Sequence, residues 1–153
     1  MALRAAGHGL RVCVVQFVKS RADTGEVRAL ALLPGAEVCV CGEGFVRASD
    51  GADRRAGHRE AAERGLAVAA AKLADGAYGM VVLDEVCCAV AFGLLRAEDV
   101  LKAVGGAAPG TVAVLTGRDA CERLIGAADT VSRVETVKHG LDAGWPAQAG
   151  VEW

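Results

Sequence analysis

The chain has 153 residues, a formal charge of −2 and 53% hydrophobic residues. A length near 150 residues predicts one domain, residues 1–153, with a core of its own, and the apolar content excludes a disordered chain. The nearly neutral charge offers no basic field, so we expect no nucleic-acid partner. No apolar run reaches the roughly 20 residues of a membrane span, and residues 1–9 do not resemble a signal peptide. We therefore expect no membrane contact and a cytoplasmic location.

The predicted elements alternate between helix and strand. Residues 1–7 resemble the end of a helix closed by Gly7, and residues 10–17 form an apolar, β-branched run typical of a buried strand. A helix follows as far as Leu33, and Asp23-x-x-Glu26 resembles the capping box at its start. The remaining segments predict strands at 36–41, 80–85, 111–115 and near 130–134, and helices at 58–75, 86–92, 96–104 and 120–126.

This alternation predicts an α/β fold. Strands that are apolar throughout are typical of a mostly parallel sheet with helices on both faces. Ligands of such sheets bind at the carboxyl ends of the strands. Polar or glycine-rich segments follow the predicted strands, and we expect the functional residues there. The segments are 16–19, 42–47, 84–85 and 116–118.

The cysteines do not have the spacing of a metal site. The sequence holds six of them. Cys39 and Cys41 form a C-x-C pair and Cys87 and Cys88 a C-C pair, whereas zinc sites are typically built from CxxC pairs or Cys/His sets. Most of the cysteines lie in apolar runs, so we expect buried, reduced thiols.

Four side chains at the predicted sheet edge are candidates for ligand chemistry. Asp84 and Glu85 end an apolar strand, which fits a Walker B element holding Mg²⁺ beside nucleotide phosphates. The same pattern also suits a strand followed by the acidic first turn of a helix. Arg118 has the geometry to bind a phosphate, or it lies in an ordinary turn. Phe45 on its glycine-rich loop suits a flat hydrophobic ligand, or it packs on the core.

A phosphate-binding loop is not found in this sequence. The pattern G-x-x-x-x-G-K-[ST], whose backbone N–H groups cradle phosphates, does not occur among the 153 residues. We therefore expect this polypeptide alone to bind ATP weakly.

Six short motifs, in order and over essentially the whole chain, resemble the ATP:corrinoid adenosyltransferases of the CobA/CobO/BtuR type. The resemblance implies a P-loop NTPase-like (RecA-like) fold. Its first strand and phosphate loop would be missing here, through a misassigned start or a true truncation. The motifs are residues 4–19, Gly42-x-Gly-Phe45, Val81-Val-Leu-Asp84-Glu85, residues 93–101, Leu115-Thr-Gly-Arg118, and residues 127–152 with Lys138-His139.

The resemblance implies a reaction and its participants. The 5′-deoxyadenosyl group of ATP would pass to a Co(I) corrinoid, cobalamin or cobyrinic acid a,c-diamide, with release of triphosphate, in adenosylcobalamin synthesis or salvage. ATP and the corrinoid would be substrates, and Mg²⁺ the cofactor. A reductase such as a flavoprotein and a second copy of the chain are the expected protein partners.

The resemblance also implies roles for individual residues. Phe45 would be the catalytic ring that faces the corrinoid and keeps a lower axial ligand off cobalt. Some family members carry a second aromatic residue where this chain has Arg47, a departure that concerns the tightness of the corrinoid pocket. The implied sets are Glu85 and Asp84 for the metal, Thr116, Arg118 and Lys138 for the nucleotide, and Gly44 and Phe45 for the corrinoid.

Two other interpretations stay open at this point. One is a catalytically incompetent relative that only binds a corrinoid or a partner protein. The other is an unrelated nucleotide-dependent ATPase of the same fold.

Overall fold

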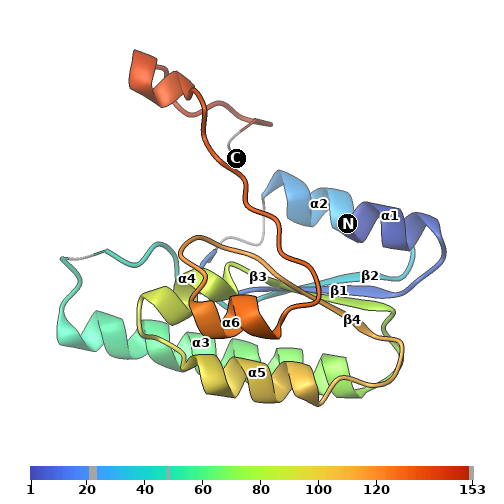
Figure 1. Cartoon of the computed structure of the whole chain (residues 1–153). Helices are drawn as coiled ribbons and strands as arrows, with labels where there is room; N and C mark the ends of the chain where they lie inside the picture. Colours follow the sequence, from blue (N-terminus) through green and yellow to red (C-terminus); the bar gives the residue numbers. More distant parts are fainter. Residues whose placement is uncertain (21–23, 48, 152–153) are drawn as a thin grey trace.

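A computed structural model describes residues 1–20, 24–47 and 49–151 (Figure 1). Within these ranges four strands form one all-parallel sheet in the order β2-β1-β3-β4. β1 and β3 lie at the centre and are the most buried strands, because each has a neighbour on both sides. The strands are β1 (Val12–Gln16), β2 (Ala36–Val40), β3 (Met80–Asp84) and β4 (Val112–Leu115).

Helices cover both faces of the sheet, which confirms the predicted α/β fold (Figure 1). α1 (Ala2–Gly7) and α2 (Gly25–Ala31) lie on one face, over a small cluster that includes Val12 and Val14. The larger core lies on the other face, where Cys13 and Val15 point, because successive strand residues alternate between faces. The helices of that face are α3 (Ala52–Ala74), α4 (Val86–Ala91), α5 (Ala97–Gly105) and α6 (Glu122–Ala127).

Several predicted boundaries shift. α3 begins at Ala52, ahead of the predicted start at residue 58. The prediction missed its first turns because they are exposed and carry no apolar periodicity. Gly7 remains inside α1, and the glycine that leaves the helix in a left-handed conformation is Gly9, with φ 76°. Asp23 of the predicted capping box lies outside the described residues.

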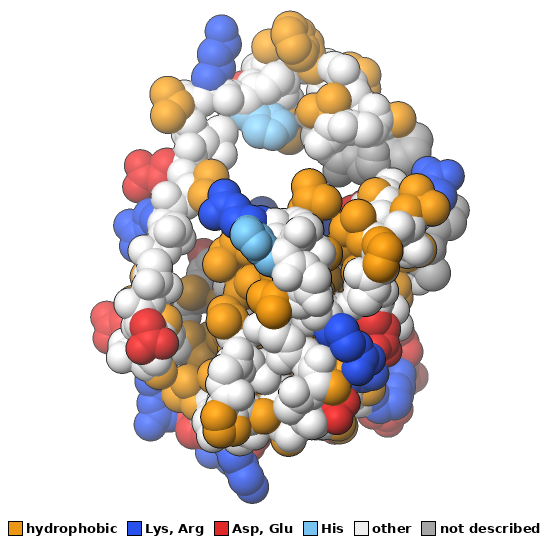
Figure 2. All heavy atoms as spheres, turned by 90° about the vertical axis from the view of Figure 1, so that its right-hand side faces the viewer, with side chains coloured by type: hydrophobic (Ala, Val, Ile, Leu, Met, Phe, Trp, Pro, Cys, Tyr) orange, Lys and Arg blue, Asp and Glu red, His pale blue; other side chains and the backbone are white. Residues whose placement is uncertain are grey.

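The strand predicted near residues 130–134 is wrong. This segment has no regular secondary structure, and Val134 is 97% exposed. A strand needs a neighbour for its N–H and C=O groups, and within the described ranges β4 pairs only with β3. The chain instead leaves the body as a tail that contains the short 3-10 helix η1 (Gly140–Ala143), and Figure 2 shows an opening between tail and body.

None of the described helices is long and apolar enough to cross a membrane.

The loop after β2 is held against the end of β1. The backbone N–H groups of Cys41 and Gly42 donate to the carbonyl of Gln16, at 3.0 and 3.2 Å, and that of Gly44 donates to Val18 at 2.9 Å. A Cβ atom on Gly42 would lie 2.4 Å from the carbonyl carbon of Val18. Only glycine allows this approach, which places the loop residue Phe45 beside β1.

We expect Gly42→Ala to destabilise the fold by about 2 kcal/mol, because the added methyl group meets backbone that must move. Urea unfolding followed by circular dichroism measures the change. Gly105→Ala is the matched control, since nothing lies within 4 Å of a Cβ atom at that helical position. Equal unfolding midpoints for the two variants would contradict this account of the loop.

A polar network joins β2 to α3 and the loop before β3. The Glu37 carboxylate accepts hydrogen bonds from Lys72 Nζ at 2.8 and 3.0 Å and from the Tyr78 hydroxyl at 2.5 Å. Arg11 lies over the Tyr78 ring, with its guanidinium carbon 4.6 Å from the centroid. The hydrogen bonds from Lys72 and then Tyr78 lower the pKa of Glu37 below its ordinary value of 4.5.

The pKa of Glu37 is lower in the folded chain than in the unfolded chain. Its contribution to the free energy of unfolding is therefore complete above pH 4.5 and is lost as the pH falls through the folded pKa. We expect Glu37→Gln to cost about 1 kcal/mol at pH 7, a value reduced because the side chain is partly exposed. The difference from wild type should vanish in acid. Urea unfolding at several pH values tests this, with the exposed Glu60→Gln as control. A cost that stays constant down to acid pH would be the contrary result.

Candidate active site

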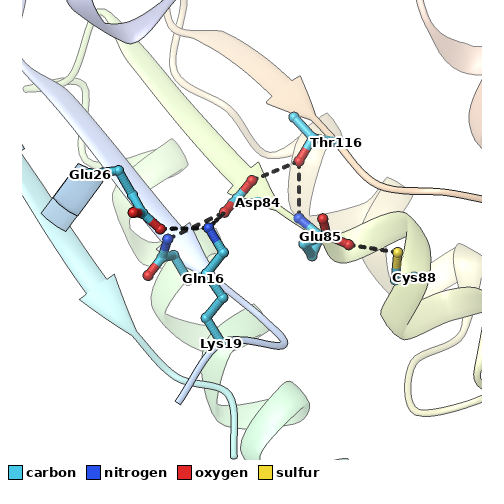
Figure 3. Close-up of polar contacts among 7 residues, drawn as sticks. All are labelled: Gln16, Lys19, Glu26, Asp84, Glu85, Cys88 and Thr116. Atoms are coloured by element: carbon cyan, nitrogen blue, oxygen red, sulfur yellow. Dashed lines mark hydrogen bonds and ion pairs between the residues drawn. The ribbon is translucent and has the colours of Figure 1, made fainter. Parts of the chain in front are cut away.

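The register of the sheet brings polar side chains together at its carboxyl edge (Figure 3). Gln16 is the register partner of Asp84, and Leu83 pairs with Leu115, so that Thr116 follows beside Asp84. One oxygen of Asp84 accepts a hydrogen bond from Thr116 Oγ1 at 2.9 Å, and the other accepts one from Gln16 Nε2 at 3.3 Å. Asp84 therefore links three neighbouring strands.

Glu85, the next residue, has an unusual backbone. Its φ of 66° is left-handed, a conformation that costs a non-glycine residue about 1 kcal/mol. Its N–H donates to Thr116 Oγ1 at 3.0 Å, which helps to hold it there. One carboxylate oxygen accepts a hydrogen bond from the Cys88 thiol at 2.7 Å. No residue of the described ranges donates a hydrogen bond to the other oxygen.

Lys19 supplies a positive charge at the same edge. Its Nζ atom lies 2.6 Å from Glu26 on α2 and 4.0 Å from Asp84 (Figure 3). Burial works to lower the pKa of Lys19, but the hydrogen bond to Glu26 and the charges of Asp84, Glu26 and Glu85 outweigh it, so the pKa rises. Lys19 is therefore protonated at neutral pH.

A pocket opens beside these groups. Its lining combines apolar side chains, from the segments after β1 and β2 and from the end of α4, with the charged groups of Lys19, Glu85 and Arg118. Phe45 is 75% exposed and Phe92 43% exposed, so both rings are available to a ligand. The lining residues are Val18, Lys19, Phe45, Val46, Glu85, Cys88, Phe92 and Arg118.

Of the site residues predicted from the sequence, the structure brings three together in this pocket: Phe45, Glu85 and Arg118. Asp84 and Thr116 lie behind Glu85, where their side chains hydrogen-bond to each other. Gly44 immediately precedes Phe45 and has a φ of 103°, which favours glycine. Lys138, by contrast, is an exposed residue of the tail and does not line the pocket.

Sequence reasoning did not single out several residues of the site. Gln16 ends β1 and Lys19 follows it, so the predicted segment 16–19 contained both at the sheet edge but gave neither a role. Cys88 and Phe92 lie in the apolar run of a predicted helix, which carries no signal of a site. Burial, and then the hydrogen bond to Glu85, raise the pKa of the Cys88 thiol, so it stays protonated and donates.

A second cluster of potential metal ligands lies away from the pocket. Cys13, Glu37 and Cys39 have donor atoms within 4.8 Å of one another, which the spacing of the cysteines did not predict. Burial raises the pKa of Cys13 to about 12, and the Glu37 carboxylate is held by Lys72 and Tyr78. The Cys13 thiol therefore stays protonated and the Glu37 carboxylate is already hydrogen-bonded, so this cluster is an internally satisfied network; all six cysteines are free thiols.

Comparison with known proteins gives a consistent picture. Residues 1–153 match the family ATP:corrinoid adenosyltransferase BtuR/CobO/CobP. A corrinoid adenosyltransferase of Pseudomonas aeruginosa is 43% identical over 155 residues, covering all of this chain and 74% of that protein. The corrinoid adenosyltransferase of Escherichia coli K12 and CobA of Salmonella typhimurium are each 37% identical, covering 99% of this chain and 76% of each protein.

These matches exclude an unrelated ATPase and do not favour a relative without activity, because the similar proteins are named as adenosyltransferases. The parallel sheet between two helical layers is consistent with a P-loop NTPase-like fold. The chain belongs to the ATP:corrinoid adenosyltransferase family.

Proposed function

We propose that this chain transfers the 5′-deoxyadenosyl group of ATP to a Co(I) corrinoid at the pocket between Phe45 and Glu85. The observation that carries the proposal is the mixed lining of that pocket. The same pocket is lined by the aromatic rings of Phe45 and Phe92 and by the charged groups of Lys19, Glu85 and Arg118. A flat macrocycle suits the aromatic rings and a nucleotide triphosphate the charged groups.

The reaction requires little acid–base catalysis from the protein. The Co(I) centre of the substrate supplies the electron pair that forms the cobalt–carbon bond at C5′, and the bond from C5′ to the triphosphate oxygen breaks. The triphosphate leaves with the electrons of that bond. The protein must hold the two substrates in line and stabilise the negative charge that develops on the leaving group.

Arg118 and Lys19 supply positive charge for the triphosphate. Arg118 lines the pocket on an exposed turn after β4, and its guanidinium group is suited to paired phosphate contacts. Thr116 holds the strand ends through Asp84 and Glu85, so we assign it a supporting role at the nucleotide site. Lys138 stays a proposed nucleotide contact on the strength of the family resemblance alone.

The acids fit a magnesium ion. Oxygen atoms are the ligands that Mg²⁺ prefers, and Glu85 offers one carboxylate oxygen to which no described residue donates a hydrogen bond. Asp84 has both oxygens hydrogen-bonded, so it suits a supporting position behind Glu85. A bound Mg²⁺ ion supplies charge stabilisation for phosphate oxygens.

We assign the corrinoid to the Phe45 side. The ring is 75% exposed on a loop that Gly42 and Gly44 place beside β1. An apolar ring below the macrocycle would exclude a lower axial ligand from cobalt and favour the four-coordinate, more easily reduced Co(II) state. We propose a reductase, such as a flavoprotein, as the electron source, and a homodimer as the assembly.

Removal of the Phe45 ring should weaken corrinoid use without weakening the fold. For Phe45→Ala we expect adenosylcobalamin formation to fall at least about tenfold, because burying such a ring on a ligand is worth more than 1 kcal/mol. The assay reduces cobalamin chemically, adds Mg²⁺ and ATP, and follows the absorbance change and triphosphate release. Leu32→Ala, at an 84% exposed position at the end of α2, is the control.

The wild-type chain decides the proposal itself. If it neither changes the spectrum of cob(II)alamin nor releases triphosphate, the proposed transfer is refuted for this polypeptide. If Phe45→Ala forms adenosylcobalamin as fast as wild type, the assignment of the Phe45 ring to the corrinoid site is wrong.

Neutralising Glu85 should weaken the use of Mg²⁺ and leave corrinoid binding unchanged. We expect Glu85→Gln to raise the Mg²⁺ concentration needed for half-maximal activity by about tenfold or more, because a ligand charge is lost. The cob(II)alamin spectrum should stay as in wild type. Glu63→Gln, an exposed position on α3, provides the matched loss of charge. An unchanged Mg²⁺ dependence in Glu85→Gln would argue against this residue as a ligand.

A further inference from the structure

The Cys88 side chain makes polar contacts at the pocket that the proposed reaction does not use, two of them short and a third, to the Arg118 carbonyl oxygen, at 3.9 Å. Its thiol donates to Glu85 Oε2 at 2.7 Å, and its sulfur accepts the backbone N–H of Arg118 at 3.1 Å (Figure 3 shows the first contact). The residue is 4% exposed yet lines the pocket. One buried side chain therefore contacts both the acid and the segment that carries the arginine.

The first contact determines what the Glu85 carboxylate does. Glu85 is the N-cap residue of α4, and an N-cap side chain ordinarily accepts a hydrogen bond from a backbone N–H of the first turn. Here the Glu85 side chain makes no such bond, and it accepts the Cys88 thiol from that turn instead. The thiol thus holds one oxygen and leaves the other for the pocket.

The second contact depends on a close approach of two segments. Gly117 has a φ of 129°, and a Cβ atom there would lie 2.9 Å from the backbone nitrogen of Cys88 and 3.2 Å from its sulfur. Only glycine at this position lets the turn after β4 lie against α4. The Cys88 sulfur then receives the N–H of Arg118, which fixes the turn relative to Glu85.

We infer that Cys88 is a positioning residue of this site, which orients the Glu85 carboxylate for a divalent cation and ties it to the turn that carries Arg118. This inference rests on the proposed role of Glu85 as a metal ligand. Groups that hydrogen-bond to a metal ligand commonly change metal affinity by about ten- to a hundredfold when they are removed.

Cys87 offers a built-in comparison. It is the neighbouring residue on the same helix, is 5% exposed, and packs in the larger core without a contact to the Glu85 carboxylate. Loss of its sulfur should affect stability alone. An effect specific to Cys88 would therefore separate positioning from simple filling of the core.

The test measures binding of Mn²⁺, as a substitute for Mg²⁺, by electron paramagnetic resonance in the presence of saturating ATP. We expect Cys88→Ala to weaken Mn²⁺ binding by about tenfold, and Cys88→Ser, which keeps a donor, to restore it to within about threefold of wild type. Cys87→Ala should bind as wild type does. Thermal unfolding of each variant verifies that it is folded.

A double-mutant cycle with Glu85→Gln decides how Cys88 acts. If Cys88 works through the carboxylate, Cys88→Ala adds no further loss of Mn²⁺ affinity in the Glu85→Gln background. An undiminished loss in that background, or wild-type binding by Cys88→Ala, would overturn the inference while Glu85 remains the ligand. If Glu85→Gln itself leaves Mn²⁺ binding unchanged, or wild type binds no Mn²⁺, the metal role in the proposed function fails first and Cys88 has nothing to position.

Discussion

The Asp84 carboxylate at the end of β3 holds the carboxyl edge of the sheet together. It accepts hydrogen bonds from Gln16 on one neighbouring strand and from Thr116 after the other, while Lys19 lies 4.0 Å away. Parallel strands in register end at the same level, so one residue can join three chain segments that are far apart in sequence. The geometry of Glu85, the next residue, depends on this arrangement.

The site combines backbone strain with precise support. Glu85 holds a left-handed conformation that would relax if its partners were absent, and Thr116 and Cys88 occupy its N–H and one carboxylate oxygen. A strained backbone conformation of this kind persists only when several neighbouring groups hold the residue in place. Among the described residues, none donates a hydrogen bond to the other carboxylate oxygen of Glu85, a residue that lines the same pocket as Phe45.

In the tail, by contrast, a sequence pattern typical of a strand has no neighbouring strand to pair with among the described residues. Val131, Val134 and Val137 are apolar, yet they are 55%, 97% and 98% exposed. Their segment has β-branched residues typical of a strand, but a strand exists only where another supplies hydrogen bonds. Within the described residues the sheet ends at β4, so the pattern remains an extended tail.

The sequence by itself determined the α/β class, the strands of the sheet and the edge at which the site lies, because unbroken apolar runs and polar strand ends are local patterns. It also singled out Phe45, Glu85 and Arg118, first through their positions after predicted strands and then through the motifs that carry the family resemblance. Only the tertiary structure decided that these three line one pocket. It also revealed Cys88 and Phe92, since residues in an apolar helical run show their role only when the neighbouring strand ends and loops are in place.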